Sequence, residues 1–484
     1  MMRRLDLRAT LTLITFMAIF AMATRAVVDT DLYWHLAAGR YIVETRTVPT
    51  VDPFSSTMLG KPWVDIYWLA QVVWYLIYQA LGLAGLALLV AALATTALIF
   101  VWKQLSGPVF VRALIIILAA GVSGPVWTAR PHLMTYLLTA VVAYLLFLYK
   151  WKQIDRLWLI PLLFVLWVNV HGGYIAGFML LGAFIAGEAI SNLLHFIGNE
   201  SVSWRRLRKV LIVAVISGVV LLINPHTINA VLLPLKTVGL QALQASIDEW
   251  ASPNFHQLFQ QPMIWMLLVT MVVMGWSGRR LDVTDAITLA IFAYIAFLAR
   301  RNLGLFALVC APILSRHAVA LWEKSRWGQR RLSRGQPILN AIILIVVGVA
   351  VLVKLLIPLS PAVQQPADRA ALPIGAADWI AQQRPIGTMF NSYNLGGYLL
   401  WRLWPDYPVY VDGRTDLYDD AFLREYQTVM LTAPGFEEVF DRRDVGFIVI
   451  ERNTPLAIWL AQADHWRLAY EDDQAVIFVR QNGA

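Results

Sequence analysis

The sequence predicts an α-helical membrane protein of about eleven transmembrane helices, followed by a small C-terminal α/β domain outside the cytoplasm. Two observations predict this fold class. Of the 484 residues, 59% are hydrophobic and only 14% are charged, whereas soluble proteins average about 25% charged residues. Apolar runs also recur along most of the chain, and a run of about 17–25 apolar residues is long enough to cross a bilayer as a helix.

The apolar runs predict eleven helices, at 7–27, 84–102, 110–124, 133–149, 157–171, 174–194, 210–224, 262–277, 283–299, 303–320 and 338–357. The first run follows three arginines and continues through Val28. It is therefore better explained as a retained helix than as a cleaved signal peptide. Two runs, 110–124 and 157–171, are short for a tilted span, so ten or twelve helices remain possible.

Basic residues occupy every second connection between these runs, including Lys103 and Arg112, Lys150 to Arg156, Arg205 to Lys209, and Arg279 and Arg280. Cytoplasmic loops carry such an excess of Lys and Arg. The pattern predicts insertion in the plasma (inner) membrane with a cytoplasmic N-terminus. An odd number of helices then places the C-terminal domain outside the cytoplasm. The net charge of +8 is explained by the membrane surface, and no nucleic-acid partner is expected.

The composition changes after Pro358, which divides the chain into a bundle (1–357, with a first outer loop at 28–66), a proline-rich linker (358–375) and a domain (376–484). Short apolar segments bounded by turn residues predict strands in this domain. They lie at Thr388–Asn391, Val409–Asp412, Phe447–Glu451, Trp466–Tyr470 and Ala475–Arg480, with helices at Ala376–Gln383 and Ala421–Leu431.

The first outer loop carries the most suggestive polar residues, Asp29, Asp31, Trp34, His35 and Trp63. Carboxylates, a histidine and large aromatic rings at the mouth of a bundle are the residue types that bind a sugar and move a proton. The apolar spacing after Asp31 also predicts a helix that begins there, so that a helix-capping role for Asp31 is a second explanation.

Other polar residues of the membrane half fall on the same predicted outer side, namely Arg130, His132, His171, His226, Glu249, Arg300 and Arg301. Ionisable groups at membrane level cost about 2.5–3.5 kcal/mol each, so their convergence predicts a functional cavity. Simpler explanations exist for single residues: Asn224-Pro225-His226 also suits a helix stop. Two adjacent guanidiniums suit a phosphate, either of a substrate or of an outer-leaflet lipid.

Several segments together resemble the GT-C superfamily of integral-membrane glycosyltransferases, in particular a bacterial group of GT-C-type membrane proteins. They are Asp29–Gly39, Val48–Ser55, Trp63, Trp167–Gly172, Glu249-Trp250, Tyr393–Tyr398 and Val411–Arg414. The resemblance implies a polyprenyl-phosphate-linked sugar donor and chemistry on the outer side. It also implies that Asp31 or Asp29 acts as general base or holds a divalent metal, Mg or Mn, and that Arg300, Arg301 and Arg130 hold the lipid phosphate.

These considerations predict an inverting glycosyltransferase that moves a sugar from a polyprenyl-phosphate donor to a hydroxyl of a glycan, lipid or protein acceptor. Asp31 is the expected catalytic carboxylate, supported by Asp29. The expected substrate-binding residues are Trp34, His35, Trp63, His132, His171, His226 and Glu249. Two alternatives are a transporter of lipid-linked sugars and a non-catalytic assembly or sensory membrane protein. A single cavity lined by Asp31, Arg130, His171 and Arg300 would favour the enzyme.

Overall fold

The computed structural model describes residues 6–194, 201–238, 248–325 and 337–481. The chain forms two compact units. Unit 1 comprises residues 1–25, 87–223 and 247–359, and unit 2 comprises residues 26–86, 224–246 and 360–484. Each unit is therefore assembled from segments that lie far apart in the sequence.

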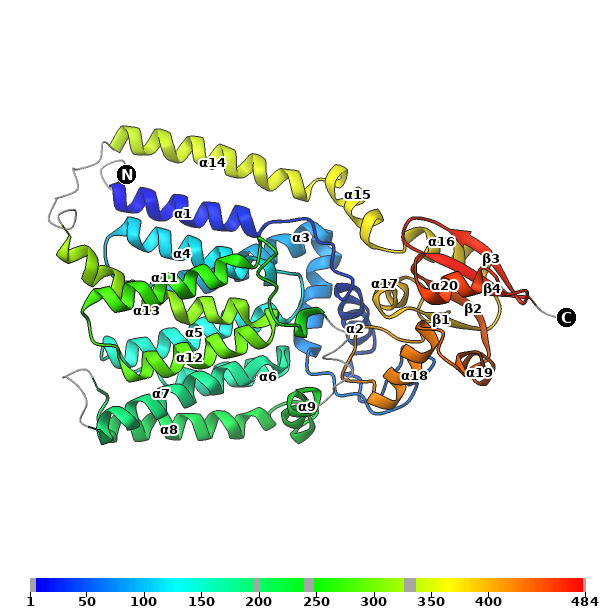
Figure 1. Cartoon of the computed structure of the whole chain (residues 1–484), viewed down its shortest axis with the longest axis horizontal. Helices are drawn as coiled ribbons and strands as arrows, with labels where there is room; N and C mark the ends of the chain where they lie inside the picture. Colours follow the sequence, from blue (N-terminus) through cyan, green and yellow to red (C-terminus); the bar gives the residue numbers. More distant parts are fainter. Residues whose placement is uncertain (1–5, 195–200, 239–247, 326–336, 482–484) are drawn as a thin grey trace. The chain divides into compact units, whose positions relative to one another are not determined.

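Unit 1 is a bundle of apolar helices that lie side by side (Figure 1). Its helices are α1 (Leu7–Ala23), the second part of α3 (Trp68–Trp102), α4 (Val109–Ser123), α5 (His132–Trp151), α6 (Leu159–Val170), α7 (Ile175–Leu193), α8 (Trp204–Val219), α11 (Gln261–Ser277), α12 (Val283–Leu298), α13 (Leu303–Lys324) and α14 (Pro337–Leu359). Within the bundle, α13 packs against α4, α11 and α12, and α1 packs against α14.

Each of the eleven predicted runs is helical in the structure. In the described part of the chain, six helices are long and apolar enough to cross a membrane, and four further apolar helices have 10–17 residues. The protein is therefore an integral membrane protein. Eleven crossings, the cytoplasmic N-terminus and the extracytoplasmic C-terminal domain stay predictions.

Helix α3 is interrupted at Gly82, where the backbone adopts φ 61° and ψ −157°. A side chain is disfavoured in this conformation, and glycine adopts it without steric cost. The sequence predicted only the part after this break, at 84–102. The part before it, which starts at Trp68, belongs to unit 2.

A buried ionic cluster joins three helices of unit 1. Lys150 of α5 bonds Glu188 of α7, and its Nζ lies 2.6 Å from an oxygen of Asp282 at the start of α12. The Thr284 hydroxyl also donates to Glu188, at 2.7 Å. Each charge thus has a partner, as burial requires. These contacts give Glu188 a structural role.

Unit 2 combines helices with a four-stranded sheet (Figure 1). The helices are α2 (Leu32–Thr45), the first part of α3, α9 (Ile228–Val238), α15 (Pro361–Ala371), α16 (Ile374–Gln383), α17 (Tyr393–Leu403), α18 (Asp420–Met430), α19 (Phe436–Arg442) and α20 (Pro455–Leu460). The strands are β1 (Thr388–Asn391), β2 (Val445–Ile450), β3 (Trp466–Glu471) and β4 (Val476–Arg480), in the order β1-β2-β4-β3. Strands β1 and β2 are parallel, and the other pairs are antiparallel.

Four of the five predicted strands are present, but Val409–Asp412 is not a strand of the sheet. Its backbone bonds the first outer loop instead: Val409 accepts from the N–H of Ser56, and the Thr57 hydroxyl donates to the carbonyl of Tyr410. The Asn391 amide donates to the carbonyl of Val411. The segment is extended and apolar, as a strand is, but its backbone hydrogen bonds are made with a loop. The sequence pattern is the same in both cases.

The C-terminal segment and the first outer loop are packed together within unit 2. Helix α17 packs against α2, with Gly397 at the contact and Gly396 against the segment after α17 that carries Val411. A Cβ on Gly397 would lie 2.7 Å from the carbonyl oxygen of Thr30, and a Cβ on Gly396 would lie 2.0 Å from that of Val411. The predicted linker forms α15, where Gln364 bonds the backbone N–H and carbonyl of Val27.

Candidate functional site

Asp31 lies at the start of α2, as the sequence predicts. It occupies the N-cap position, but its side chain makes no capping hydrogen bond to the first turn. The capping explanation for this aspartate is therefore not supported. Asp29 instead fixes the turn, because its Oδ1 accepts a hydrogen bond of 3.0 Å from the backbone N–H of Asp31. Both carboxylates are half-buried.

Gly413 lies directly against the Asp31 carboxylate. A Cβ built on this glycine would lie 2.2 Å from Oδ1 of Asp31 and 2.7 Å from Nε1 of Trp34. Real Cβ atoms do not approach other atoms so closely, so only glycine fits here without a shift. The C-terminal segment of unit 2 thus forms one wall around the candidate catalytic carboxylate.

Arg414, the next residue, is fully buried and anchors this wall. Its guanidinium forms ion pairs with Asp52 of the first outer loop and with Asp412, the latter at 2.7 Å. The rings of Trp63 and Phe54 lie 4.8 Å and 5.1 Å from its Cζ atom. A planar guanidinium suits two carboxylates and stacked rings at once. The arginine therefore fixes the first outer loop to the segment that carries Gly413.

Unit 2 contains a second acidic pair, the fully buried Asp65 and the half-buried Asp416. Burial, and to a lesser extent the charge of Asp416, raises the pKa of Asp65 to about 8. Burial also raises the pKa of Asp416 to about 6. Asp65 accepts from the Gln71 amide at 3.1 Å, and that amide lies 3.4 Å from Nδ1 of His35. Because Asp65 mostly keeps its proton at neutral pH, it is a poor general base.

The aromatic and histidine candidates of unit 2 are all buried. Trp34 packs on His35, with 3.5 Å between ring centroids. Trp63, 2% exposed, lies beneath Arg414 in the core, which gives it a packing role. His226 is buried too, and its backbone N–H donates to Oδ1 of Asn224. Contact between any of these residues and a substrate stays a prediction.

In unit 1, cationic candidates from separate connections come together. Arg130, just before α5, forms a 2.7 Å ion pair with Glu249. The guanidinium of Arg301, just before α13, lies 4.5 Å from the ring of Trp250. Arg300 donates its backbone N–H to the carbonyl of the residue after Trp250, at 3.0 Å. The connection before α11 thus contacts both basic segments.

His171 is held in one tautomer by its neighbours. The backbone N–H of Gly173 donates to its Nδ1 at 2.8 Å, and the Thr135 hydroxyl lies at the same distance from this nitrogen. The indole of Trp167 donates to the Thr135 oxygen, so the hydroxyl hydrogen is left for His171. Because Nδ1 accepts, a neutral His171 carries its proton on Nε2.

His132 lies beside His171, with 6.5 Å between the ring centroids. Its Nε2 is 2.7 Å from the carbonyl of Val126 and therefore donates there. The guanidinium of Arg301 is close enough to the His171 ring for an electrostatic interaction between them. Unit 1 therefore brings together Arg130, His132, His171, Glu249 and Arg301, whereas Asp29 and Asp31 belong to unit 2.

Asp29 and Asp31 were also the predicted metal ligands. Within the described residues, no group of three or more His, Cys, Asp or Glu side chains is placed to hold a metal ion. Mg²⁺ in proteins usually keeps several waters and binds through one or two carboxylates together with substrate phosphates, so a pair of carboxylates is compatible with such an ion. A divalent metal at Asp29 and Asp31 therefore stays a prediction, and the mechanism proposed for this chain assigns no step to one.

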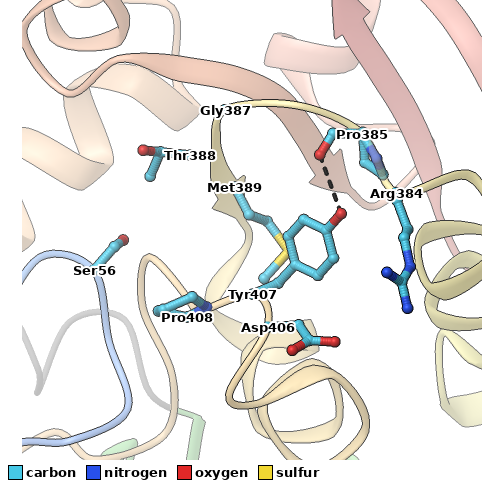
Figure 2. A pocket seen from close by; sticks show the side chains of 9 residues that line it. All are labelled: Ser56, Arg384, Pro385, Gly387, Thr388, Met389, Asp406, Tyr407 and Pro408. Carbon is cyan, nitrogen blue, oxygen red and sulfur yellow. Dashed lines mark hydrogen bonds between the residues drawn. The ribbon is translucent and has the colours of Figure 1, made fainter.

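A cleft of about 500 Å³ at the start of β1 contains none of the predicted site residues (Figure 2). Figure 2 shows Arg384 and Asp406 among its lining side chains, with the Tyr407 hydroxyl donating to the carbonyl of Pro385 at 3.1 Å. Its lining comes from unit 2 alone.

Sequence reasoning assigned no role in the site to Thr135, Gln71, Gly413, Arg414 or Asp416. Thr135 and Gln71 lie inside apolar helices, where a single polar residue gives no pattern. The other three belong to the polar turn Asp412–Asp416, which the sequence marked as the end of a strand. Three charged residues within the five residues of this turn were the feature of the sequence that could have indicated a site there.

A scan of protein-family models and a search of curated proteins find no match to this sequence. Solved structures do match. The oligosaccharyltransferase AglB from Archaeoglobus fulgidus, in complex with an inhibitory peptide and a dolichol-phosphate, has a TM-score of 0.57 at 12% identity, over 92% of this chain and 69% of that one.

ArnT from Cupriavidus metallidurans bound to undecaprenyl phosphate has a TM-score of 0.52 at 14% identity and covers 98% of both chains. The arabinofuranosyltransferase AftD from Mycobacteria has a TM-score of 0.51 at 13% identity, over 98% of this chain and 41% of that one. At such low identity these likenesses establish the fold alone, and this chain shares the fold of these three solved structures.

Proposed function

We propose that the chain is an inverting glycosyltransferase that moves a sugar from a polyprenyl-phosphate donor to an acceptor hydroxyl at the outer face of the membrane. The observation that carries this proposal is the Asp31 carboxylate, fixed against Gly413 at the start of α2 in a chain with the GT-C fold. ArnT and AglB were solved with a polyprenyl phosphate and a dolichol-phosphate, which supports the same class of donor here.

In the proposed reaction, Asp31 accepts the proton of the acceptor hydroxyl while its oxygen attacks the anomeric carbon of the donor. A positioned carboxylate of this kind contributes about 10²–10⁴-fold to a rate. The bond from the anomeric carbon to the phosphate oxygen breaks, and the phosphate leaves with the electron pair. One displacement from the face opposite the phosphate inverts the configuration at that carbon.

The leaving phosphate gains negative charge, which fixed cations stabilise. Arg130, Arg300 and Arg301 supply these cations in the proposal, and the Nε2–H of His171 supplies a neutral donor beside them. Asp29 holds the backbone of Asp31 and so positions the base.

Replacing both Arg300 and Arg301 with Ala is expected to weaken donor binding while the protein stays folded. Hydrogen bonds to charged groups are worth about 1.5–3 kcal/mol, so the dissociation constant for a polyprenyl-phosphate sugar should rise by at least about tenfold. The adjacent pair Arg279 and Arg280, between α11 and α12, is the matched control, and its double Ala variant should bind normally. Unchanged donor affinity in the first variant would reduce Arg300 and Arg301 to lipid anchors.

Replacing Gly413 with Ala is expected to lower kcat by about 10²-fold, because the new methyl group must displace the Asp31 carboxylate and a shift of about 1 Å can have such an effect. Donor KM should change little, since the donor-phosphate residues are not touched. Gly275→Ala adds the same methyl group where nothing lies within 4 Å, so it should leave kcat unchanged. Equal kinetics for the two variants would contradict the positioning role of Gly413.

A further inference from the structure

A second cleft in unit 2, of about 480 Å³, opens at the edge of the sheet where the parallel strands β1 and β2 both end. Ser392 and Asn394 follow β1, and Glu451 to Thr454 follow β2. The turn between β3 and β4 contributes Gln474. Ligands in open α/β sheets bind outside the carboxyl ends of the strands, and this volume lies within the range of about 300–1,000 Å³ for small-ligand sites.

One polar group of this cleft is left without a partner. Ser392, 2% exposed, is the N-cap of α17, yet its hydroxyl makes no capping bond and no other hydrogen bond. The first N–H of α17, on Tyr393, donates to the Tyr426 hydroxyl at 2.8 Å instead. Tyr426 therefore keeps a hydroxyl hydrogen that it can donate. A buried unpaired hydroxyl is costly unless a ligand satisfies it.

The charge of the lining decides against an anion. Arg452 is its one basic side chain, and it forms a 2.7 Å ion pair with Glu471. Glu451 and Asp473 are both acidic and line the same cleft. A phosphate or carboxylate ligand would meet more negative charge than positive charge there.

The remaining lining suits a neutral ligand with many hydroxyl groups. Asn394, Asn453 and Gln474 are amides, which both donate and accept hydrogen bonds. The acidic side chains only accept, and the Tyr426 ring and Met430 offer apolar surface for C–H groups. A sugar hydroxyl also donates and accepts, so that a glycan matches this mixture. A peptide would need several apolar pockets for its side chains, whereas only Tyr426 and Met430 bring large apolar groups to this cleft.

We propose that this cleft binds a glycan through its hydroxyl groups, with Ser392, Tyr426 and Asn453 among its contacts. Glycan binding by this cleft does not depend on the function proposed above. The assignment of this glycan as the acceptor does rest on that function. The segment Tyr393–Tyr398 would then have two roles, because Gly397 of α17 packs against the first outer loop and the helix begins at the glycan cleft.

The test uses the full-length protein, purified in detergent, on an array of defined neutral and acidic oligosaccharides and on an array of short peptides. The wild-type protein should bind one set of neutral or weakly charged oligosaccharides. The double variant Ser392→Ala and Asn453→Ala should bind them about tenfold or more weakly, since each lost hydrogen bond is worth about two- to tenfold. Gln462→Ala, an exposed amide of the same domain outside the cleft, should bind like the wild type.

Three results would overturn the proposal: no oligosaccharide bound by the wild type, oligosaccharide binding that the double variant retains, or binding of peptides alone that the double variant loses. Donor hydrolysis separates this proposal from the enzymatic one. A double variant that still releases polyprenyl phosphate to water, but no longer glycosylates the bound oligosaccharide, supports both proposals. A wild-type protein that binds oligosaccharides but consumes no donor supports the cleft and contradicts the enzyme.

Discussion

Asp31→Asn is expected to be folded and inactive. Asparagine caps a helix as well as aspartate, and the Asp31 side chain makes no capping bond that could be lost. The backbone N–H that bonds Asp29 is unaltered by the substitution. An amide cannot accept the proton of the acceptor at neutral pH, so turnover should fall by about 10²–10⁴-fold. Turnover and thermal unfolding of the purified variant provide the two measurements.

Asp29→Asn is the matched control for this experiment. Its Oδ1 can still accept the bond from the Asp31 N–H, so the turn should persist and turnover should fall far less. Near-normal turnover by a folded Asp31→Asn protein would exclude this residue as the base. An inactive Asp29→Asn beside an active Asp31→Asn would transfer the role to Asp29.

Arg414→Met is expected to cause the largest loss of stability among single substitutions at this site. Methionine keeps much of the side-chain volume but leaves the carboxylates of Asp52 and Asp412 buried without their cation. Removing one partner of a buried ion pair costs about 3–5 kcal/mol. The midpoint of denaturation should therefore fall sharply, and turnover should fall with it because Gly413 loses its anchor.

Arg402→Met provides the contrast within the same unit. Arg402 pairs with Asp378 at 2.6 Å, but both side chains are more than one-third exposed. Such surface pairs contribute about 0–1 kcal/mol, so this variant should unfold near the wild-type midpoint. Adding Asp52→Asn and Asp412→Asn to Arg414→Met should restore part of the stability, since no unpaired charge is then buried. Equal midpoints for Arg414→Met and Arg402→Met would contradict the anchoring role.

The positions of most helices and strands could be predicted from the sequence, because they follow from the pattern of hydrophobic residues. Each predicted apolar run is a helix, and the strands flanked by turn residues lie within a few residues of the predicted bounds. The segment 409–412 shows the limit. Alternating or continuous apolar residues predict an extended backbone, but they do not say whether a neighbouring strand or a loop meets its hydrogen bonds.

The candidate site was less predictable, since its contacts join residues far apart in the chain. Asp52 and Arg414 pair across more than 300 residues, and no local pattern identifies one from the other. Conversely, Trp63 belongs to the first outer loop, but its ring packs beneath Arg414. A sequence does not distinguish these two roles, because large aromatic rings occur both in protein cores and against sugar faces. The charged turns are visible in the sequence, and only the structure shows which of them meet.

The most direct test of the central claim is turnover by the purified protein. It is incubated with a panel of polyprenyl-phosphate sugars and an envelope extract as acceptor, and released polyprenyl phosphate is measured. We expect release from at least one donor by the wild type and at least about 10²-fold less by Asp31→Asn. A transporter or an assembly protein would release none. Folded wild-type protein that binds these donors but releases no polyprenyl phosphate from any of them would contradict the account.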